Sequence, residues 1–226
     1  MSFGAKMILL CVVAGGVVGF FGYQEWQLAK TGSETPEVVD LAKIEAGSAP
    51  TSTWVKLGEH HRLYFQCVYE YETGRGESAQ TANSKVNHCY YPVISSTNKF
   101  ITDLQAFVAE HGGVDNIPDD AAWPEPDSFS VLVKSNDYKK VSELPEDMEL
   151  SPGLEGVIIN RISSLKPDEK KLIQQSFPTV NLEKVLVVQK DRKLKSLGTT
   201  YAMMGGGAAI ALVPLLLFLA MRKRSA

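Results

Sequence analysis

The residue types that most often carry chemistry are sparse in this chain, and their spacing is poor for metal binding. The histidines are His60, His61, His88 and His111. Adjacent residues of a strand point to opposite faces, so His60 and His61 cannot chelate one ion from a regular strand. The same limit holds for His88 and Cys89. Because no C-x₂-C or H-x₃-H spacing occurs, the sequence predicts no metal site and no cofactor.

Nucleophilic catalysis has no stronger support in the sequence. The chain contains no G-x-S-x-G elbow, and neither of its glycine-rich stretches, 74–76 and 205–207, precedes the Lys-Ser/Thr pair of a phosphate loop. The acidic residues are scattered, which is typical of a solvated face rather than of a paired acid and base. We therefore predict no catalytic residue and favour a non-enzymatic protein over an enzyme of unrecognised type.

Cys67 and Cys89 stand 22 residues apart in two strand-like runs, and they meet if those runs pair as a hairpin. A disulfide between them suits an oxidising, extracytoplasmic compartment. Two reduced and buried thiols leave the same pattern in a sequence, so both alternatives remain open.

Aromatic residues gather on the same two runs. We favour a core of aromatic cross-strand pairs. If one face of the hairpin is uncovered, Tyr64 and Tyr90 form a candidate interaction surface, because amphipathic tyrosines suit protein–protein contacts. The aromatic residues concerned are Tyr64, Phe65, Tyr69, Tyr71, Tyr90 and Tyr91.

The pattern of expected strands and helices predicts one α+β domain over residues 51–200. Residues 24–50 before it are expected to form a linker and a short helix, which begins at Pro36 with Glu34 or Thr35 as its cap. Alternation and turn residues predict about five strands and, with the linker helix, three short helices. Pro92 implies an edge position or a bulge. The expected strands lie at 52–72, 86–95, 128–134, 154–162 and 182–189, and the other two helices at 101–111 and 168–176.

Two charge-free apolar segments bracket this domain. Residues 7–23 and 201–221 hold 17 and 21 residues, and about 20 apolar residues cross a bilayer as a helix. A cleaved signal peptide is the rival interpretation of the first segment, but bulky residues fill the places where small cleavage-site residues belong. We therefore predict two transmembrane helices, with Tyr23 and Trp26 in an interfacial aromatic belt.

Small residues recur at helical spacing in both segments. Gly15 and Gly19 form G-x-x-x-G, and Gly205 and Ala209 form a small-xxx-small pair, as do Gly207 and Ala211. Such faces let helices approach closely in lipid. The sequence predicts that the two helices pack on each other, on a second copy or on a partner; glycine and alanine are also simply common in membrane helices.

Basic residues give the expected topology. Lys6 and the triplet Arg222, Lys223 and Arg224 favour cytoplasmic positions for residues 1–6 and 222–226. The basic residues just before the second span favour the opposite orientation, but long loops translocate largely regardless of charge. We predict a two-pass protein with both termini cytoplasmic and the domain extracytoplasmic.

The net charge of the region between the apolar segments limits the classes of partner that it can bind. Residues 24–200 hold all 26 acidic residues and 19 basic ones, a formal net charge of −7, which disfavours nucleic acid as a partner. We expect membrane lipids and a protein partner, or self-association through the membrane helices. The expected function is an interaction or assembly module of a membrane complex. The alternatives are a membrane-anchored enzyme and a small-ligand sensor or transporter accessory domain.

Overall fold

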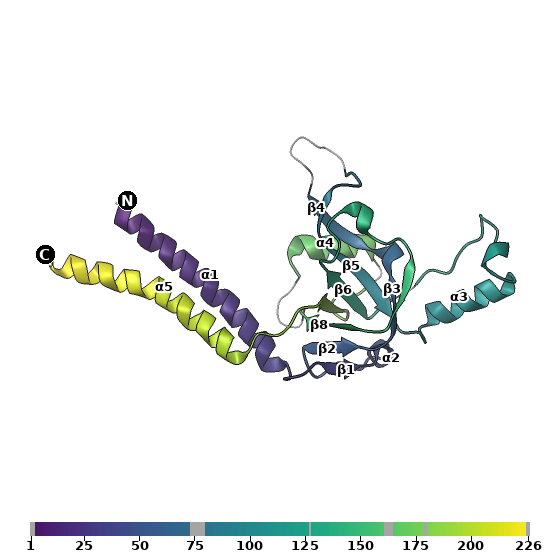
Figure 1. Ribbon diagram of the computed structural model, residues 1–226, viewed down its shortest axis with the longest axis horizontal. Helices are drawn as coiled ribbons and strands as arrows, with labels where there is room; N and C mark the ends of the chain where they lie inside the picture. Colours follow the sequence, from purple (N-terminus) through teal and green to yellow (C-terminus); the bar gives the residue numbers. More distant parts are fainter. Residues whose placement is uncertain (1–2, 73–79, 127, 161–164, 179, 225–226) are drawn as a thin grey trace. The chain divides into compact units, whose positions relative to one another are not determined.

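The computed structural model describes residues 3–72, 80–126, 128–160, 165–178 and 180–224, which form two compact units. One unit joins the two ends of the chain, residues 1–33 and 194–226, and the other is the central domain Glu34–Lys193. Figure 1 draws both units.

The first unit is an antiparallel hairpin of two long helices, α1 (Phe3–Thr31) and α5 (Leu197–Arg224). The N-terminal end of α1 and the C-terminal end of α5 lie at the same end of this hairpin (Figure 1). Both helices extend several residues beyond the apolar segments. Each is long and apolar enough to cross a membrane, and only 11% of each apolar window is buried. A core helix of a soluble protein is mostly buried, so these helices differ from that class.

The central domain is a mixed α+β fold with nine strands among the residues that the structure describes. They form one sheet in the order β1-β2-β8-β9-β6-β5-β3-β7, and β4 pairs with β5 beside this path. The strands are β1 (Glu37–Val39), β2 (Trp54–Leu57), β3 (His60–Leu63), β4 (Val68–Glu72), β5 (Lys85–Ile94), β6 (Val131–Ser135), β7 (Met148–Ser151), β8 (Leu154–Ile158) and β9 (Leu186–Lys190).

Short helices join these strands. The α-helices of the domain are α2 (Leu41–Glu45), α3 (Lys99–Glu110) and α4 (Pro167–Ser176). Three 3₁₀ turns complete the described elements: η1 (Tyr64–Gln66), η2 (Val114–Asn116) and η3 (Val141–Glu143). Helix α3 extends outward from the sheet in Figure 1, and its buried residues, Phe100 and Ile101, lie in its first turn.

The strand count exceeds the expected five for two local reasons. The run 52–72 forms three strands, because the strand is interrupted at Gly58 and Glu59 between β2 and β3, and the chain then makes the η1 turn before β4. Strands β1 and β7 were not expected from the sequence. The predicted linker helix is present, but its start at Pro36 and its cap are wrong: β1 occupies that start, and α2 begins only after Asp40, whose side chain accepts a hydrogen bond from the amide of Ala42.

Alternation along the central strands builds a core on each face of the sheet. On β6, Val131 and Val133 join one cluster, whereas Leu132 joins the other. Helix α2 covers the first face through Leu41 and Ile44, and α4 covers the second. Strand β5 is buried on both faces over most of its length, which explains its almost unbroken apolar run.

Pro92 lies in central strand β5, so the expected edge position is wrong. The pairing of β5 with β4 ends at Tyr90, and the pairing of β5 with β3 begins at Val93, so Pro92 lies between the two partners on this side. The chain between β3 and β4 makes the η1 turn at this level. Proline lacks an amide hydrogen, and here the sheet requires none on that side.

Candidate functional site

The contact between the two long helices is made by glycine backbones. A Cβ atom on Gly207 would lie 2.6 Å from the Gly15 carbonyl oxygen and 2.5 Å from the Gly19 amide nitrogen. A Cβ atom on Gly15 would lie 2.7 Å from the amide nitrogen of Ala211. These distances leave no space for any side chain, so glycine is required for this close approach.

The structure thus brings the predicted Gly15 and Gly19 together with Gly207 and Ala211. The other predicted pair, Gly205 and Ala209, is exposed, and a Cβ atom on Gly205 would meet nothing within 4 Å. Two small-residue rows ran along the second segment, and spacing alone did not distinguish the row that faces α1.

Polar and aromatic side chains join the C-terminal part of α1 to the N-terminal part of α5. The rings of Tyr23 and Trp26 stack with their centroids 5.8 Å apart, and the Trp26 indole donates a hydrogen bond of 3.3 Å to the hydroxyl of Tyr201. The Lys30 ammonium lies 5.2 Å from the Trp26 ring. Such amphipathic rings are typical of a membrane–water interface. The predicted Arg222, Lys223 and Arg224 belong to the last turn of α5, and their side chains lie outside the described residues.

Tyr64 and Tyr90 are core residues, so the candidate interaction surface predicted for them is wrong. Their residues are 3% and 0% exposed. The Tyr64 ring packs on Tyr91 with centroids 4.7 Å apart and on Tyr138 at 6.0 Å. Tyr90 belongs to the core cluster on the opposite face of the sheet. Both faces of β5 are covered, and no outward aromatic face remains on it.

The two cysteines of the domain lie close together, and the structure draws no bond between them. Tyr69 of β4 pairs with Cys89 of β5, so Cys67 lies two residues away on the same face of the sheet. Cys89 is fully buried, whereas Cys67 is partly exposed. A hydrogen bond with Cys67, together with burial, raises the pKa of the Cys89 thiol far above its usual range.

A cluster of charged groups is buried where α4 packs on the sheet. Nζ of Lys134, on β6, lies 2.7 Å from Oε1 of Glu169, on α4, and these side chains are only 16% and 8% exposed. Nε2 of His88, on β5, lies 3.3 Å from Glu169 and 3.4 Å from Glu70 of β4. Glu169 also accepts a hydrogen bond of 3.1 Å from the amide of Lys166, which fixes it at the start of α4.

Burial and neighbouring charges shift the titration of this cluster. Burial by itself raises the pKa of Glu169, but the hydrogen bond and charge of Lys134 outweigh it and hold that pKa below its usual range. Burial, followed by the nearby Lys134 charge, lowers the pKa of His88, so this imidazole is neutral at pH 7. Burial and then the Glu169 charge raise the pKa of Tyr90. At neutral pH the cluster is a carboxylate–ammonium pair flanked by a neutral imidazole and a phenol.

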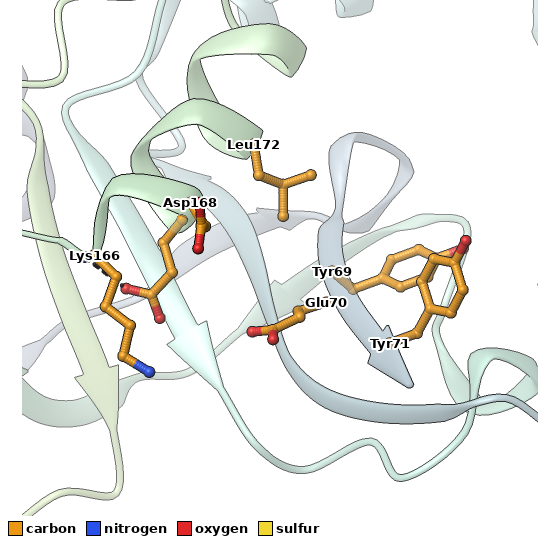
Figure 2. Close-up of a pocket in the computed structure, with 7 residues that line it drawn as sticks. Tyr69, Glu70, Tyr71, Lys166, Asp168 and Leu172 are labelled. Atoms are coloured by element: carbon orange, nitrogen blue, oxygen red, sulfur yellow. Dashed lines mark hydrogen bonds between the residues drawn. The ribbon is translucent and has the colours of Figure 1, made fainter. Parts of the chain in front are cut away.

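A pocket of about 390 Å³ opens beside this cluster, between β4 and the first turns of α4. Figure 2 shows the Glu70 side chain pointing from β4 toward α4, where Lys166 and Asp168 lie. The rings of Tyr69 and Tyr71 lie side by side on the other face of β4. The pocket lining carries three carboxylates and one ammonium, so its field favours a positively charged group.

The remaining histidines lie apart from this cluster. His60 is buried on β3, and its Nδ1 lies 2.7 Å from the Gly58 carbonyl oxygen. His111 ends α3, and its Nδ1 lies 2.8 Å from the Phe107 carbonyl oxygen. Within the described residues, no three His, Cys, Asp or Glu side chains come together in a group that could hold a metal ion.

Sequence reasoning missed the cluster around Glu169, although each member carried a weak signal. Lys134 ends a buried apolar run, where an isolated ammonium needs a partner. Glu169 stands three residues after Lys166, a spacing that fits a helix N-terminus but also fits a solvated turn. Nothing in the spacing of 35 residues links the two, because the pairing of β6 with α4 is a property of the tertiary fold.

No protein-family model, curated protein or solved structure matches this chain.

Proposed function

We propose that this protein is a two-span integral membrane protein whose acidic α+β domain is an interaction or assembly module, without catalytic activity, in a membrane complex. The observation that carries the proposal is the hairpin of α1 and α5. The two helices meet through glycine backbone, and most of the outer surface is formed by exposed apolar side chains. Those side chains include Leu9, Leu10, Val13, Phe20, Leu212 and Leu216, each at least half exposed.

Such a surface supports insertion in lipid for an energetic reason. Monomeric soluble proteins rarely expose contiguous apolar patches beyond a few hundred Å². In a bilayer the same side chains contact hydrocarbon at no cost, and the helices make their backbone hydrogen bonds internally except at Pro214, which lacks an amide hydrogen. The aromatic group of Tyr23, Trp26 and Tyr201 supports a membrane–water boundary at this level of the hairpin.

The proposed orientation has both chain ends in the cytoplasm and the domain outside it. Lys6 and the basic triplet Arg222–Arg224 support this orientation through the positive-inside rule. The domain carries a net charge of −7 in residues 24–200, so anionic headgroups repel it as a whole. The partner surface is therefore proposed to be protein rather than lipid or nucleic acid.

Within the membrane, the small-residue row that α1 leaves uncovered is the proposed contact for a partner helix or a second copy. Gly205 and Ala209 are exposed on α5. Cross-linking in native membranes, followed by native mass measurement in mild detergent, tests this contact. We expect a stoichiometric complex that Gly205→Leu with Ala209→Leu dissociates, while Ile210→Leu, an exposed control on the same helix, leaves it intact. A monomer from the unmodified protein would overturn the assembly proposal.

A second candidate function is small-ligand binding by the domain, and the pocket between β4 and α4 favours it. Convergent polar groups at the edge of an apolar cavity are typical of ligand sites. The surplus of carboxylates selects a cation, so the probes are methylguanidinium and, as its opposite, acetate. We expect calorimetric binding of methylguanidinium that weakens in Asp168→Asn, with no binding of acetate. Equal responses to the two probes would exclude this function.

A further inference from the structure

Cys67 and Cys89 differ in their access to solvent in a way that suits stepwise oxidation. Cys67 follows η1 and lines a pocket of about 370 Å³ together with Phe65, Tyr69 and Leu144. Cys89 lies behind it in the core, with no exposed surface. A small molecule that enters this pocket reaches the first sulfur and not the second.

The register of β4 and β5 places the two residues diagonally opposite each other, at slightly more than the spacing that a disulfide requires. Residues diagonal to each other across an antiparallel ladder have Cα atoms about 7–8 Å apart, and disulfides usually join Cα atoms about 4.4–6.8 Å apart. The β4–β5 ladder begins at Val68, so Cys67 precedes it. A residue outside the ladder adjusts its backbone without breaking ladder hydrogen bonds, and a small shift at η1 closes the remaining gap.

We propose that Cys67 and Cys89 are a disulfide-forming pair, in which Cys67 is the entry thiol and Cys89 is the resolving thiol. The oxidant is a low-molecular-weight disulfide. The bond fixes the η1–β4 junction to central strand β5. This inference concerns the domain alone and does not depend on the proposed membrane function.

The exchange proceeds in two balanced steps. The Cys67 thiolate attacks one sulfur of the small disulfide, whose S–S bond breaks, and one thiolate leaves with the electron pair. Cys89 then loses its proton to solvent and attacks Sγ of Cys67, and the second small thiolate leaves. The protein gives up two electrons and two protons in total, and the small disulfide is reduced to two thiols.

Access and burial set the order of the two steps. Cys67 lines the pocket, whereas Cys89 has no exposed surface. The contact with Cys67, followed by burial, raises the pKa of the Cys89 thiol, so Cys89 is the less reactive thiol of the free pair. Once Cys67 is bound in the mixed disulfide, the contribution of its thiol to the Cys89 pKa is lost and Cys89 is easier to deprotonate.

The test uses the full chain in detergent, with Cys11→Ala as the parent so that only the two thiols of the domain remain. The parent, Cys67→Ala and Cys89→Ala proteins are incubated with oxidised glutathione, alkylated with N-ethylmaleimide in denaturant, and weighed intact. Alanine is used because it removes the thiol without adding a hydroxyl group at a buried position. Near-ultraviolet circular dichroism checks that each variant is folded.

We expect the parent to lose the mass of two hydrogen atoms, to accept no alkyl group and to yield a cross-linked peptide containing residues 67 and 89. Cys89→Ala should retain one glutathionyl group, and folded Cys67→Ala should remain unmodified before denaturation. A parent with two alkylated thiols or a stable glutathionyl adduct would overturn the pair. Glutathionylation of Cys67→Ala as fast as that of Cys89→Ala would overturn the assigned roles. The result from the parent needs no substitution in the pair, so it stands even if a variant misfolds.

Discussion

Lys134→Met removes the ammonium from the buried pair and leaves the Glu169 carboxylate without its main partner. The two charged atoms are 2.7 Å apart, and both side chains are more than four-fifths buried. Breaking such a pair from one side costs about 3–5 kcal/mol because an uncompensated charge remains. The amide of Lys166 still donates to Glu169, which borders the pocket, so we expect about 3 kcal/mol, the lower end of that range.

Native-state hydrogen exchange of the full chain in detergent measures this loss in the domain alone. The slowest amides of β5 and β6 report global opening of the sheet. A loss of about 3 kcal/mol lowers their protection by a factor of about one hundred, since about 1.4 kcal/mol corresponds to a factor of ten. The amides of α1 and α5 should not change.

Two further variants make this prediction specific. Lys99→Met breaks the pair of Lys99 with Asp103, whose side chains are 78% and 43% exposed, and it should cost less than about 0.5 kcal/mol. Combining Lys134→Met with Glu169→Gln removes the orphaned charge and should restore most of the protection. The reasoning fails if Lys134→Met is no worse than Lys99→Met, or if the double variant is as unstable as Lys134→Met.

Other predictions concern the helix contact, the titration of His88 and the packing of α4. Gly207→Leu should separate the two helices, because its side chain would collide with the backbone of Gly15, whereas the side chain of the control Gly206→Leu meets open space. Spin labels near the two chain ends should report a longer distance in Gly207→Leu only, and equal distances in the two variants would contradict the glycine contact. The unfolding free energy should fall as the pH drops below about 6.5, because burial lowers the pKa of folded His88 and the unfolded chain binds that proton first. His88→Gln should reduce this slope without abolishing it, because burial also lowers the pKa values of His60 and His61, and an unchanged slope would contradict the assignment. Ile173→Ala, at a fully buried position of α4, should cost about 2–5 kcal/mol by hydrogen exchange, and a cost below about 1 kcal/mol would contradict the packing of α4.

Local patterns predicted the parts of this fold that local physics determines. The α+β class and most elements were expected, because apolar alternation and helix signals act over a few residues. The helix predicted at 101–111 is observed as α3, two residues earlier and capped by Asn98. The strand predicted at 86–95 is observed as β5. Part of the strand predicted at 154–162 lies outside the described residues.

The parts that failed depend on contacts between distant residues. Alternation in 52–72 does not show that η1 interrupts it, because a 3₁₀ turn is too short to leave a period. The interaction surface predicted at Tyr64 and Tyr90 failed because it required one uncovered face of the hairpin. Whether a face is covered depends on α2 and α4, which lie far away in the chain. The candidate site around Glu169 requires β4, β5, β6 and α4 together, and no single window of sequence contains it.

The central claim is that two helices cross a membrane and hold the domain on the side opposite the chain ends. Single cysteines at exposed Asp119, in the domain, and at Ala5, beside Lys6, test it by labelling intact cells with a membrane-impermeant maleimide. Position 5 is used because its substitution keeps the charge of Lys6, which supports the orientation. The unmodified chain provides the background from its own cysteines. We predict that Asp119→Cys is labelled in intact cells and that Ala5→Cys is labelled only after permeabilisation. Labelling of Ala5→Cys in intact cells, or equal labelling of both, would contradict the account.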